Sequence, residues 1–337
     1  MSLLRDTYFP KNFKDFKVHK ENVIKYKNFV SDKEIFNTIF YGPKGSGKYT
    51  ILMNMLIEVL GESVLKKKNT KFNITKSCGN SKEFTILEST YHFEININKY
   101  LFNDRISLVN LINQLIQTKD INTYKYKIIV IRNLHYLKAD VINFFSSVTE
   151  KYCDNCRFLM TSSNSMTYIN KILMGRFMMI KVPSPSIEEL FIFSQEILNS
   201  CKCNITDSQI NNIINYSDRN LNKLLLYLQF NCENKKYFKY KNTLELYCEH
   251  IYKLIKKKKI ENLIKVREFA YDLITKNINI TSFIIELVKF FNKQEIEVEK
   301  KIEIVSWGSI FQSRLSKSYK EIIHLEAFIF KIIEILN

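Results

Sequence analysis

The sequence predicts an α/β nucleotide-binding domain built on a parallel sheet, followed by a region made of helices. Three observations support this prediction. A glycine-rich phosphate-binding loop occupies 42–50. Short apolar runs alternate with longer helical stretches up to about residue 180, and apolar residues at helical spacing continue to the end of the chain. We expect strands at the apolar runs 38–41, 128–131, 157–161 and 178–182.

The phosphate-binding loop lies between the first predicted strand and a predicted helix at 51–60. Glycines let successive amides point at phosphate oxygens, the helix adds its positive N-terminal end, and Lys48 supplies a charge for the β- and γ-phosphates. Tyr49 stands where a serine or threonine hydroxyl would bind Mg²⁺, and Thr50 is about 100° further around the helix. The residues expected to bind nucleotide are Gly42, Pro43, Lys44, Gly45, Ser46, Gly47, Lys48, Tyr49 and Thr50.

The second predicted strand is not followed by catalytic acids. Hydrolysis at such a site needs an aspartate for Mg²⁺ and a group that activates water, but the residues here are Arg132, Asn133, Leu134 and His135. Asn133 cannot accept a proton, and Arg132 places positive charge where Mg²⁺ would bind. A lone histidine such as His135 is more typical of a surface or hydrogen-bonded residue than of a base. We predict a chain that holds ATP or ADP, with a doubtful Mg²⁺ site and a degenerate acid box.

Seven segments distributed in order along the chain resemble one family. Together they resemble the small subunits of replication factor C, the sliding-clamp loader of eukaryotes and archaea, and most of all the small subunit whose loop ends in GKKT and whose acid box is degraded. The resemblance runs from residue 1 to about 330. The segments are MSLLRDTYFPKNFKDFKVHKENV, YGPKGSGKYT, STYHFEIN, VTEKYCDNCRFLM, KVPSPSIEEL, SDRNLNKLLL and IIHLEAF.

The resemblance implies three domains: an AAA+ core over 1–183, a helical lid over 184–236 and a helical collar over 237–337 where subunits pack as a ring. The sequence agrees with the first boundary, because Pro183 and Pro185 interrupt the chain. Ser186 and Glu189 then form a plausible capping box at the start of a helix.

The resemblance also implies roles for single residues. Arg176, in Gly175-Arg176-Phe177, corresponds to the arginine that reaches into a neighbour's ATP site. Ser163 or Asn164 corresponds to a polar sensor, and Asn222 stands where the lid normally supplies an arginine. Separately, an apolar cluster after the strand that ends near residue 97 is expected to face the clamp, with burial in the domain's own core as the alternative. Its members are Tyr100, Leu101 and Phe102.

Composition constrains the partners. The formal net charge is +17, which favours an anionic partner, most simply DNA contacted through its phosphates. A chain rich in Lys, Asn and Ile also fits AT-rich coding, and the runs Lys66-Lys67-Lys68 and Lys256 to Lys259 are expected to be solvated surface or an import-like signal rather than base-reading elements. No apolar stretch is long enough for a bilayer, and charges from Arg5 onwards do not fit a secretory leader. Seven cysteines suggest reduced thiols in an intracellular protein, and no metal site is predicted. The family resemblance implies a nuclear location, or the replication compartment if the protein is viral.

The most specific expectation is a non-hydrolysing or weakly hydrolysing clamp-loader subunit. Its partners would be the other subunits of a hetero-pentameric ring, a sliding clamp and primer–template DNA. Two alternatives remain open at this point. One is an autonomous ATPase in which Thr50 and a rearranged site restore hydrolysis. The other is a subunit shared with an alternative or checkpoint loader ring.

Overall fold

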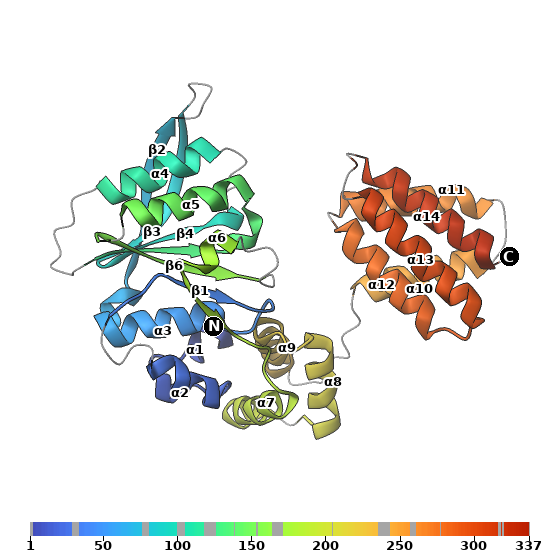
Figure 1. The fold of residues 1–337 in the computed structure, drawn as a ribbon. Coiled ribbons are helices and arrows are strands. Elements are labelled where there is room, and N and C mark those ends of the chain that lie inside the picture. Colours follow the sequence, from blue (N-terminus) through green and yellow to red (C-terminus); the bar gives the residue numbers. More distant parts are fainter. Residues whose placement is uncertain are drawn as a thin grey trace. The chain divides into compact units, whose positions relative to one another are not determined.

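The computed structural model describes residues 3–28, 34–75, 81–99, 105–117, 126–137, 139–152, 154–163, 171–203, 205–234, 243–256, 261–276, 278–315, 318 and 320–336. The chain forms two compact units, residues 1–238 and 239–337 (Figure 1). The division of the first unit at residue 183 into a core and a lid stays a prediction.

The first unit contains a sheet and helices around it. In chain order its elements are α1 (Leu4–Thr7), η1 (Phe13–Asp15), α2 (Lys20–Asn28), β1 (Thr38–Tyr41), α3 (Lys48–Leu60), η2 (Glu62–Leu65), β2 (Lys67–Thr75), β3 (Ser81–Ser89), β4 (His92–Asn96), η3 (Ile97–Lys99), α4 (Arg105–Gln117), β5 (Lys127–Arg132), η4 (Leu134–Tyr136), α5 (Ala139–Lys151), β6 (Cys156–Ser162), α6 (Lys171–Met174), β7 (Met178–Lys181), α7 (Ile187–Cys201), α8 (Asp207–Ser217) and α9 (Leu221–Asn234).

The strands form one sheet in the order β2-β3-β4-β5-β6-β1-β7. The pairs from β4 to β7 are parallel, whereas β2 and β3 are antiparallel additions at one edge. All four predicted strands are present, as β1, β5, β6 and β7. The predicted parallel α/β sheet is therefore confirmed.

The central strands are buried on both faces, as parallel strands covered by helices must be. Alternate residues of β5 enter different cores: Ile129 and Ile131 pack on the side of α4 and α5, and Ile128 and Val130 on the side of α3. Figure 1 shows α4 and α5 on one face of the sheet and α3 on the other. This packing fixes the carboxyl end of β5, where Arg132 lies.

The hairpin of β2 and β3 was not among the predicted strands. Its sequences KKNTKFNIT and SKEFTILES are too polar to stand out as apolar runs. The period-two pattern is present, however, because Ile74, Phe84 and Ile86 are buried in the core. The expectation that residues 66–68 are all solvated surface is wrong for Lys67, whose side chain is only 16% exposed. Its aliphatic stem and ammonium turn toward β4.

Helices α7 to α9 form a small cluster with its own core, which includes Leu190, Ile213 and Leu228. The predicted capping box begins α7: the Ser186 hydroxyl accepts the Glu189 amide, and the Glu189 side chain accepts the Ser186 amide. The first residues of α9 lie against the phosphate-binding loop, because the Leu221 amide donates to the Gly45 carbonyl at 3.0 Å.

The second unit is helical, as predicted. It contains α10 (Thr243–Lys256), α11 (Glu261–Thr275), α12 (Ile280–Lys293), α13 (Val298–Leu315) and α14 (Glu321–Leu336) around a single core. The apolar residues at helical spacing in the last helix include Leu325, Ile329 and Ile332, and all three are fully buried. Within the described ranges, no helix combines the length and apolar character needed to cross a membrane.

Candidate nucleotide-binding site

The phosphate-binding loop joins β1 to α3, and two of its glycines are required by close contacts. Gly42 lies against β7: an added Cβ would be 2.0 Å from the Val182 carbonyl oxygen. Gly45 has φ +78°, and its Cβ would be 1.9 Å from Oδ1 of Asn220, just before α9. These contacts hold the loop between the sheet and the small helical cluster, which leaves its amides facing a cavity at the start of α3.

Lys48 is the first residue of α3 and is largely buried. Its ammonium donates to the carbonyl oxygens of Gly42 at 2.9 Å and Pro43 at 2.6 Å. Burial, and after it the charge of Lys44, lower the pKa of Lys48 to about 8. An anionic phosphate would favour the charged form of this amine. Lys48 therefore lies at the cavity, and its role as the phosphate-binding lysine stays a prediction.

A cavity of about 520 Å³ opens beside the loop, a volume that suits a nucleotide. Its lining comes from the N-terminal segment, the loop with α3, the ends of β5 and β6, and α9. The predicted site residues that line this cavity are Lys44, Gly45, Gly47, Lys48, Tyr49, Thr50, Arg132, Asn133, Ser163 and Asn222. Most of the predicted nucleotide-site residues therefore converge on one place.

Tyr49 is held by a buried ionic cluster rather than directed at a metal position. Its hydroxyl donates to Oε2 of Glu94 at 2.9 Å and accepts from Nζ of Lys67 at 2.6 Å. Lys67 also donates to Oε2 of Glu94 at 2.6 Å. Burial, and after it the charge of Glu94, raise the pKa of Tyr49, so its hydroxyl stays protonated.

Arg132 completes this cluster from the end of β5. Its NH1 donates to Oε1 of Glu94 at 2.9 Å, and its guanidinium lies 4.0 Å from the centre of the Tyr49 ring. Burial alone would raise the pKa of Glu94, but its contacts with Lys67 and Arg132 outweigh burial and lower the pKa. Glu94 is therefore a buried carboxylate that binds Tyr49, Lys67 and Arg132. We call these four residues the Glu94 cluster.

The other positions of the acid box form hydrogen bonds within the protein. Asn133 has φ +62°, its amide donates to Oγ1 of Thr161, and its side chain donates to Asn96. The Ser163 amide donates to Nδ1 of His135 at 3.2 Å. Burial, followed by the charges of Lys44 and Lys48, lowers the pKa of His135. His135 does not line the cavity, which agrees with the hydrogen-bonded role that the sequence favours.

Asn222 and the N-terminal segment cover the cavity from the side of the helical cluster. The Asn222 amide donates to Oδ1 of Asn220, which caps α9, and the Asn222 side chain lines the cavity without a positive charge. His19 Nε2 is 3.1 Å from the Ser46 carbonyl oxygen, and the His19 amide donates to Glu189 of α7. The loop, the N-terminal segment and α7 are thus joined by hydrogen bonds.

Arg176 lies away from this cavity, between α6 and β7. Its NH1 donates to Oγ of Ser146 at 2.6 Å, and its NH2 forms an ion pair with Glu150; both partners are on α5. About a third of the Arg176 side chain remains exposed. The arginine is therefore held at the surface of the first unit, where another molecule can reach it.

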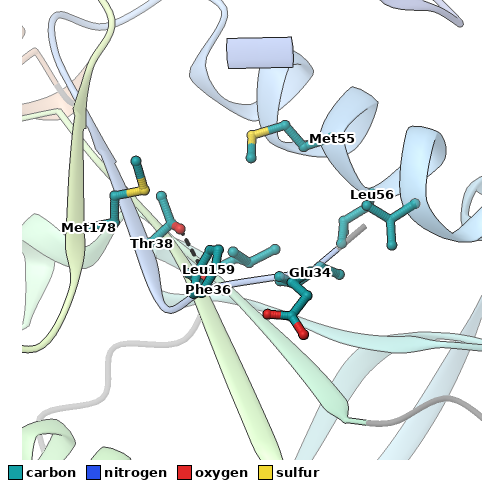
Figure 2. Close-up of a pocket in the computed structure, with 9 residues that line it drawn as sticks. Glu34, Phe36, Thr38, Met55, Leu56, Leu159 and Met178 are labelled. Atoms are coloured by element: carbon teal, nitrogen blue, oxygen red, sulfur yellow. Dashed lines mark hydrogen bonds between the residues drawn. The ribbon is translucent and has the colours of Figure 1, made fainter. Parts of the chain in front are cut away.

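Some predicted residues are not placed. Asn164 and the proposed clamp-facing residues Tyr100, Leu101 and Phe102 lie outside the described residues. A second cavity, of about 20 Å³, lies at the opposite end of β1 from the loop, lined by residues such as Phe36, Met55 and Met178. Figure 2 shows its apolar side chains with the Glu34 carboxylate at the rim. It has room for about one water molecule, so it is not a nucleotide site.

Sequence reasoning did not identify Glu94 and Lys67 as residues of the site. Glu94 was visible only as a charged residue inside the short apolar segment HFEIN of β4. Such a carboxylate indicates a buried partner, but nothing local identifies Lys67, which precedes it by 27 residues. Asn220 was also missed, although an Asn directly before a helix is a typical cap.

Comparisons with known proteins agree with the earlier resemblance. The sequence profile of the replication factor C subunit 3 C-terminal domain matches residues 245–337. Replication factor C subunit 3 of Arabidopsis thaliana is 26% identical over 98% of this chain and 96% of that protein. Subunit 5 of Saccharomyces cerevisiae is 26% identical over 98% and 99%, and subunit 3 of Homo sapiens is 26% identical over 98% and 95%.

Among solved structures, the chain is similar to the Thermotoga maritima RuvB Holliday junction branch migration motor. The TM-score is 0.47, with 14% identity over 74% of this chain and 78% of that one. The first unit has a mostly parallel α/β sheet with a phosphate-binding loop, and residues 245–337 of the separate helical unit match the replication factor C profile. These comparisons support a replication factor C small subunit, with similarity to subunits 3 and 5 over nearly the whole chain.

Proposed function

We propose that this chain is a sliding-clamp loader subunit that binds ATP or ADP, hydrolyses it weakly or not at all, and supplies Arg176 to a neighbouring subunit's ATP site. The Glu94 cluster is the observation that carries the proposal. Two of its members, Tyr49 and Arg132, occupy positions where a working ATPase has its magnesium-binding hydroxyl and its acids. Arg132 and Asn133 offer no carboxylate there, and the Tyr49 hydroxyl is engaged by Glu94 and Lys67.

Nucleotide binding has separate support from the loop. Its amides and the N-terminus of α3 face the cavity, and Lys48 is beside them. These groups bind phosphate whether or not the nucleotide is then hydrolysed. The expected role of bound nucleotide is to hold the loop and α9 together, since both line the same cavity.

The placement of Arg176 supports a role in trans. The guanidinium is exposed at the end of α6, and Glu150 and Ser146 fix its position without burying it. An arginine finger must present a fixed guanidinium to the γ-phosphate of another molecule. The contacts with α5 would orient it before the neighbour arrives.

The helical unit offers a surface for subunit packing. Along α13, Val298 and Ile302 are 71% and 64% exposed, and Val305 follows on the same face. Three apolar residues at spacings of four and three form a stripe on one side of a helix. Exposed stripes of this kind mark interfaces, and we propose that α13 contacts other subunits of a hetero-pentameric ring.

The other proposed partners are a sliding clamp and primer–template DNA. The formal net charge of +17 would attract DNA phosphates without reading base sequence. Replication factor C subunits from plant, yeast and human match nearly the whole chain, and by analogy with them we propose a nuclear location, or the replication compartment of a virus.

The deciding experiment compares two variants within the assembled complex. The chain is co-expressed with its partner subunits, and ATP turnover is measured with clamp and primer–template DNA. Arg176→Ala is expected to assemble normally and to reduce turnover at one neighbouring site, because an arginine finger contributes roughly 10³–10⁵-fold. Lys48→Ala, which disables this chain's own site, is expected to change total turnover little.

The matched control is Lys151→Ala, which removes an exposed cation next to Glu150 on α5. It is expected to leave turnover at the wild-type level. If Arg176→Ala behaves like this control, Arg176 is only a surface residue and the proposal of catalysis in trans is wrong. If Lys48→Ala abolishes a large share of turnover, the chain is itself an active ATPase. Failure to assemble with the partner subunits would contradict the loader proposal as a whole.

A further inference from the structure

The Glu94 cluster changes what the phosphate end of the cavity binds. A magnesium ion in such a site needs oxygen ligands that are free to coordinate it. Here the Tyr49 oxygen donates to one neighbour and accepts from another. The Glu94 oxygens accept three donors, from Tyr49, Lys67 and Arg132. These two residues therefore do not fit as magnesium ligands.

The remaining lining does not restore a metal site near the loop. In the part of the chain that the structure describes, two carboxylates line the cavity, Asp6 and Asp15, both in the N-terminal segment before α2. Among the described residues, no group of three or more His, Cys, Asp or Glu side chains is arranged to hold a metal ion. Thr50 lines the cavity with one hydroxyl, which suits a hydrogen bond to a phosphate oxygen but is a single neutral ligand.

The charge around the cavity is positive where the metal would lie. Among the described residues that line the cavity, five have cationic side chains: Arg5, Lys17, Lys44, Lys48 and Arg132. In the Glu94 cluster two cations surround one carboxylate, so the cluster keeps an excess positive charge. Such a surface repels a divalent cation and attracts a bare polyphosphate.

Arg132 is the cation best placed to contact that phosphate. Tyr49 stacks on one side of its guanidinium, and Glu94 accepts from NH1. Among the described residues, no partner is found for its Nε and NH2 donors. The side chain is 26% exposed and lines the same cavity as Lys48. A guanidinium fixed in this way presents further donors in a plane that matches phosphate oxygens.

We propose that Arg132 takes the place of the divalent cation in this site, so that the cavity binds the nucleoside polyphosphate as a free anion. This inference rests on the proposed function, because it assumes that the cavity holds a nucleotide. Mg²⁺ in solution binds the same phosphates and competes with Arg132 for them. By thermodynamic linkage, Mg²⁺ should therefore weaken nucleotide binding, whereas it strengthens binding in sites built to hold it.

The test measures ADP and ATP binding by titration calorimetry on the full chain, once with EDTA and once with excess MgCl₂. We expect tighter binding in EDTA. We expect Arg132→Gln to weaken binding in EDTA by about 10- to 100-fold, the effect of losing one charge-assisted hydrogen bond. Arg132→Lys should recover part of the lost affinity, because lysine restores the positive charge but not the planar guanidinium with its paired donors.

Two controls make the result specific. Lys71→Gln removes an exposed lysine from β2, outside the cavity, and should leave both dissociation constants unchanged. Thr50→Val removes the hydroxyl most able to act as a magnesium ligand, and should not change the ratio between the EDTA and MgCl₂ measurements. Thermal unfolding confirms that each variant is folded, since Glu94 keeps Lys67 as a partner in Arg132→Gln.

A second readout uses Mn²⁺ in place of Mg²⁺ and records its electron paramagnetic resonance spectrum with protein and ADP. We expect no protein-bound Mn²⁺ signal. Tighter binding in MgCl₂ than in EDTA, a bound Mn²⁺ signal, unchanged binding in Arg132→Gln, or no nucleotide binding in either buffer would each overturn the inference. Assembly with the partner subunits is measured on the same proteins, so a failed inference in a chain that still assembles is distinguished from a failed proposed function.

Discussion

Removing the carboxylate of Glu94 should destabilise the first unit strongly. The Glu94 side chain is fully buried, and the side chains of its cationic partners Lys67 and Arg132 are 16% and 26% exposed. Glu94→Gln keeps the shape of the side chain but leaves two partly buried cations without an anion. Breaking a buried ion pair by removing one partner costs about 3–5 kcal/mol. In a unit of this size, that loss lowers the melting temperature by roughly 6–20 °C.

The measurement is urea unfolding of Glu94→Gln beside Glu83→Gln. Glu83 pairs with Lys71 on the neighbouring strands β3 and β2, but both side chains are more than half exposed. A surface pair of this kind contributes about 0–1 kcal/mol. The two variants therefore make the same chemical change in a buried and in an exposed pair on one sheet.

A double-mutant cycle with Lys67→Gln tests whether the lost stability comes from the interaction between Glu94 and Lys67. If the charges are coupled, the double variant should lose less stability than the sum of the two single variants. A loss for Glu94→Gln within about 1 kcal/mol of the Glu83→Gln value would refute the reasoning. It would mean that Lys67 and Arg132 move into solvent when the carboxylate is removed.

Three further predictions follow from the site and the helical unit. The isolated chain should show no Mg²⁺-dependent ATP turnover above background, and a rate near one per second that disappears in Lys48→Ala would contradict this. Burial, and after it the charge of Lys67, lower the pKa of His92 to about 4 from 6.5, against the opposing effect of Glu94. The unfolded chain therefore binds more protons between about pH 6.5 and 4, so the free energy of unfolding should fall by about 3 kcal/mol as the pH falls through this window. When urea unfolding is measured at a series of pH values, His92→Phe should reduce this pH dependence. An unchanged pH dependence would show that His92 is not responsible. Ile302→Glu on the exposed stripe of α13 should leave the unfolding of the isolated chain unchanged but reduce co-purification with partner subunits, whereas equal recovery would exclude this face from the interface.

The sequence predicted those parts of the fold that depend on local pattern. β1, β5, β6 and β7 are apolar runs, and the helices after Ser186 follow a capping box and helical spacing. The β2–β3 hairpin was missed because its buried residues alternate with lysines and asparagines, so its mean apolar content is low. In such a strand only the period-two alternation identifies the buried face.

The candidate site was predicted as a set of residues but not as a set of contacts. Glycines, Lys48 and the missing acids are local features of the sequence. The contacts of Glu94 with Lys67 and Arg132 join residues 27 and 38 positions apart, and only the order β2-β3-β4-β5 brings them together. The same holds for Asn220, whose contact with Gly45 depends on how α9 meets the loop.

The structure also gives a physical reason why Tyr49 and Arg132 occur together. A tyrosine at this position cannot serve as the small hydroxyl ligand of Mg²⁺. Its aromatic ring also needs a neighbouring side chain to pack against. Arg132 provides that partner by stacking on the ring, and it is held by the carboxylate that also accepts the tyrosine hydroxyl. Tyr49→Thr alone would restore the hydroxyl but leave Arg132 in the metal position. Arg132→Asp alone would restore an acid but place its carboxylate beside that of Glu94. Because each single change leaves an unfavourable charge arrangement, we expect magnesium binding at this site to require both changes together.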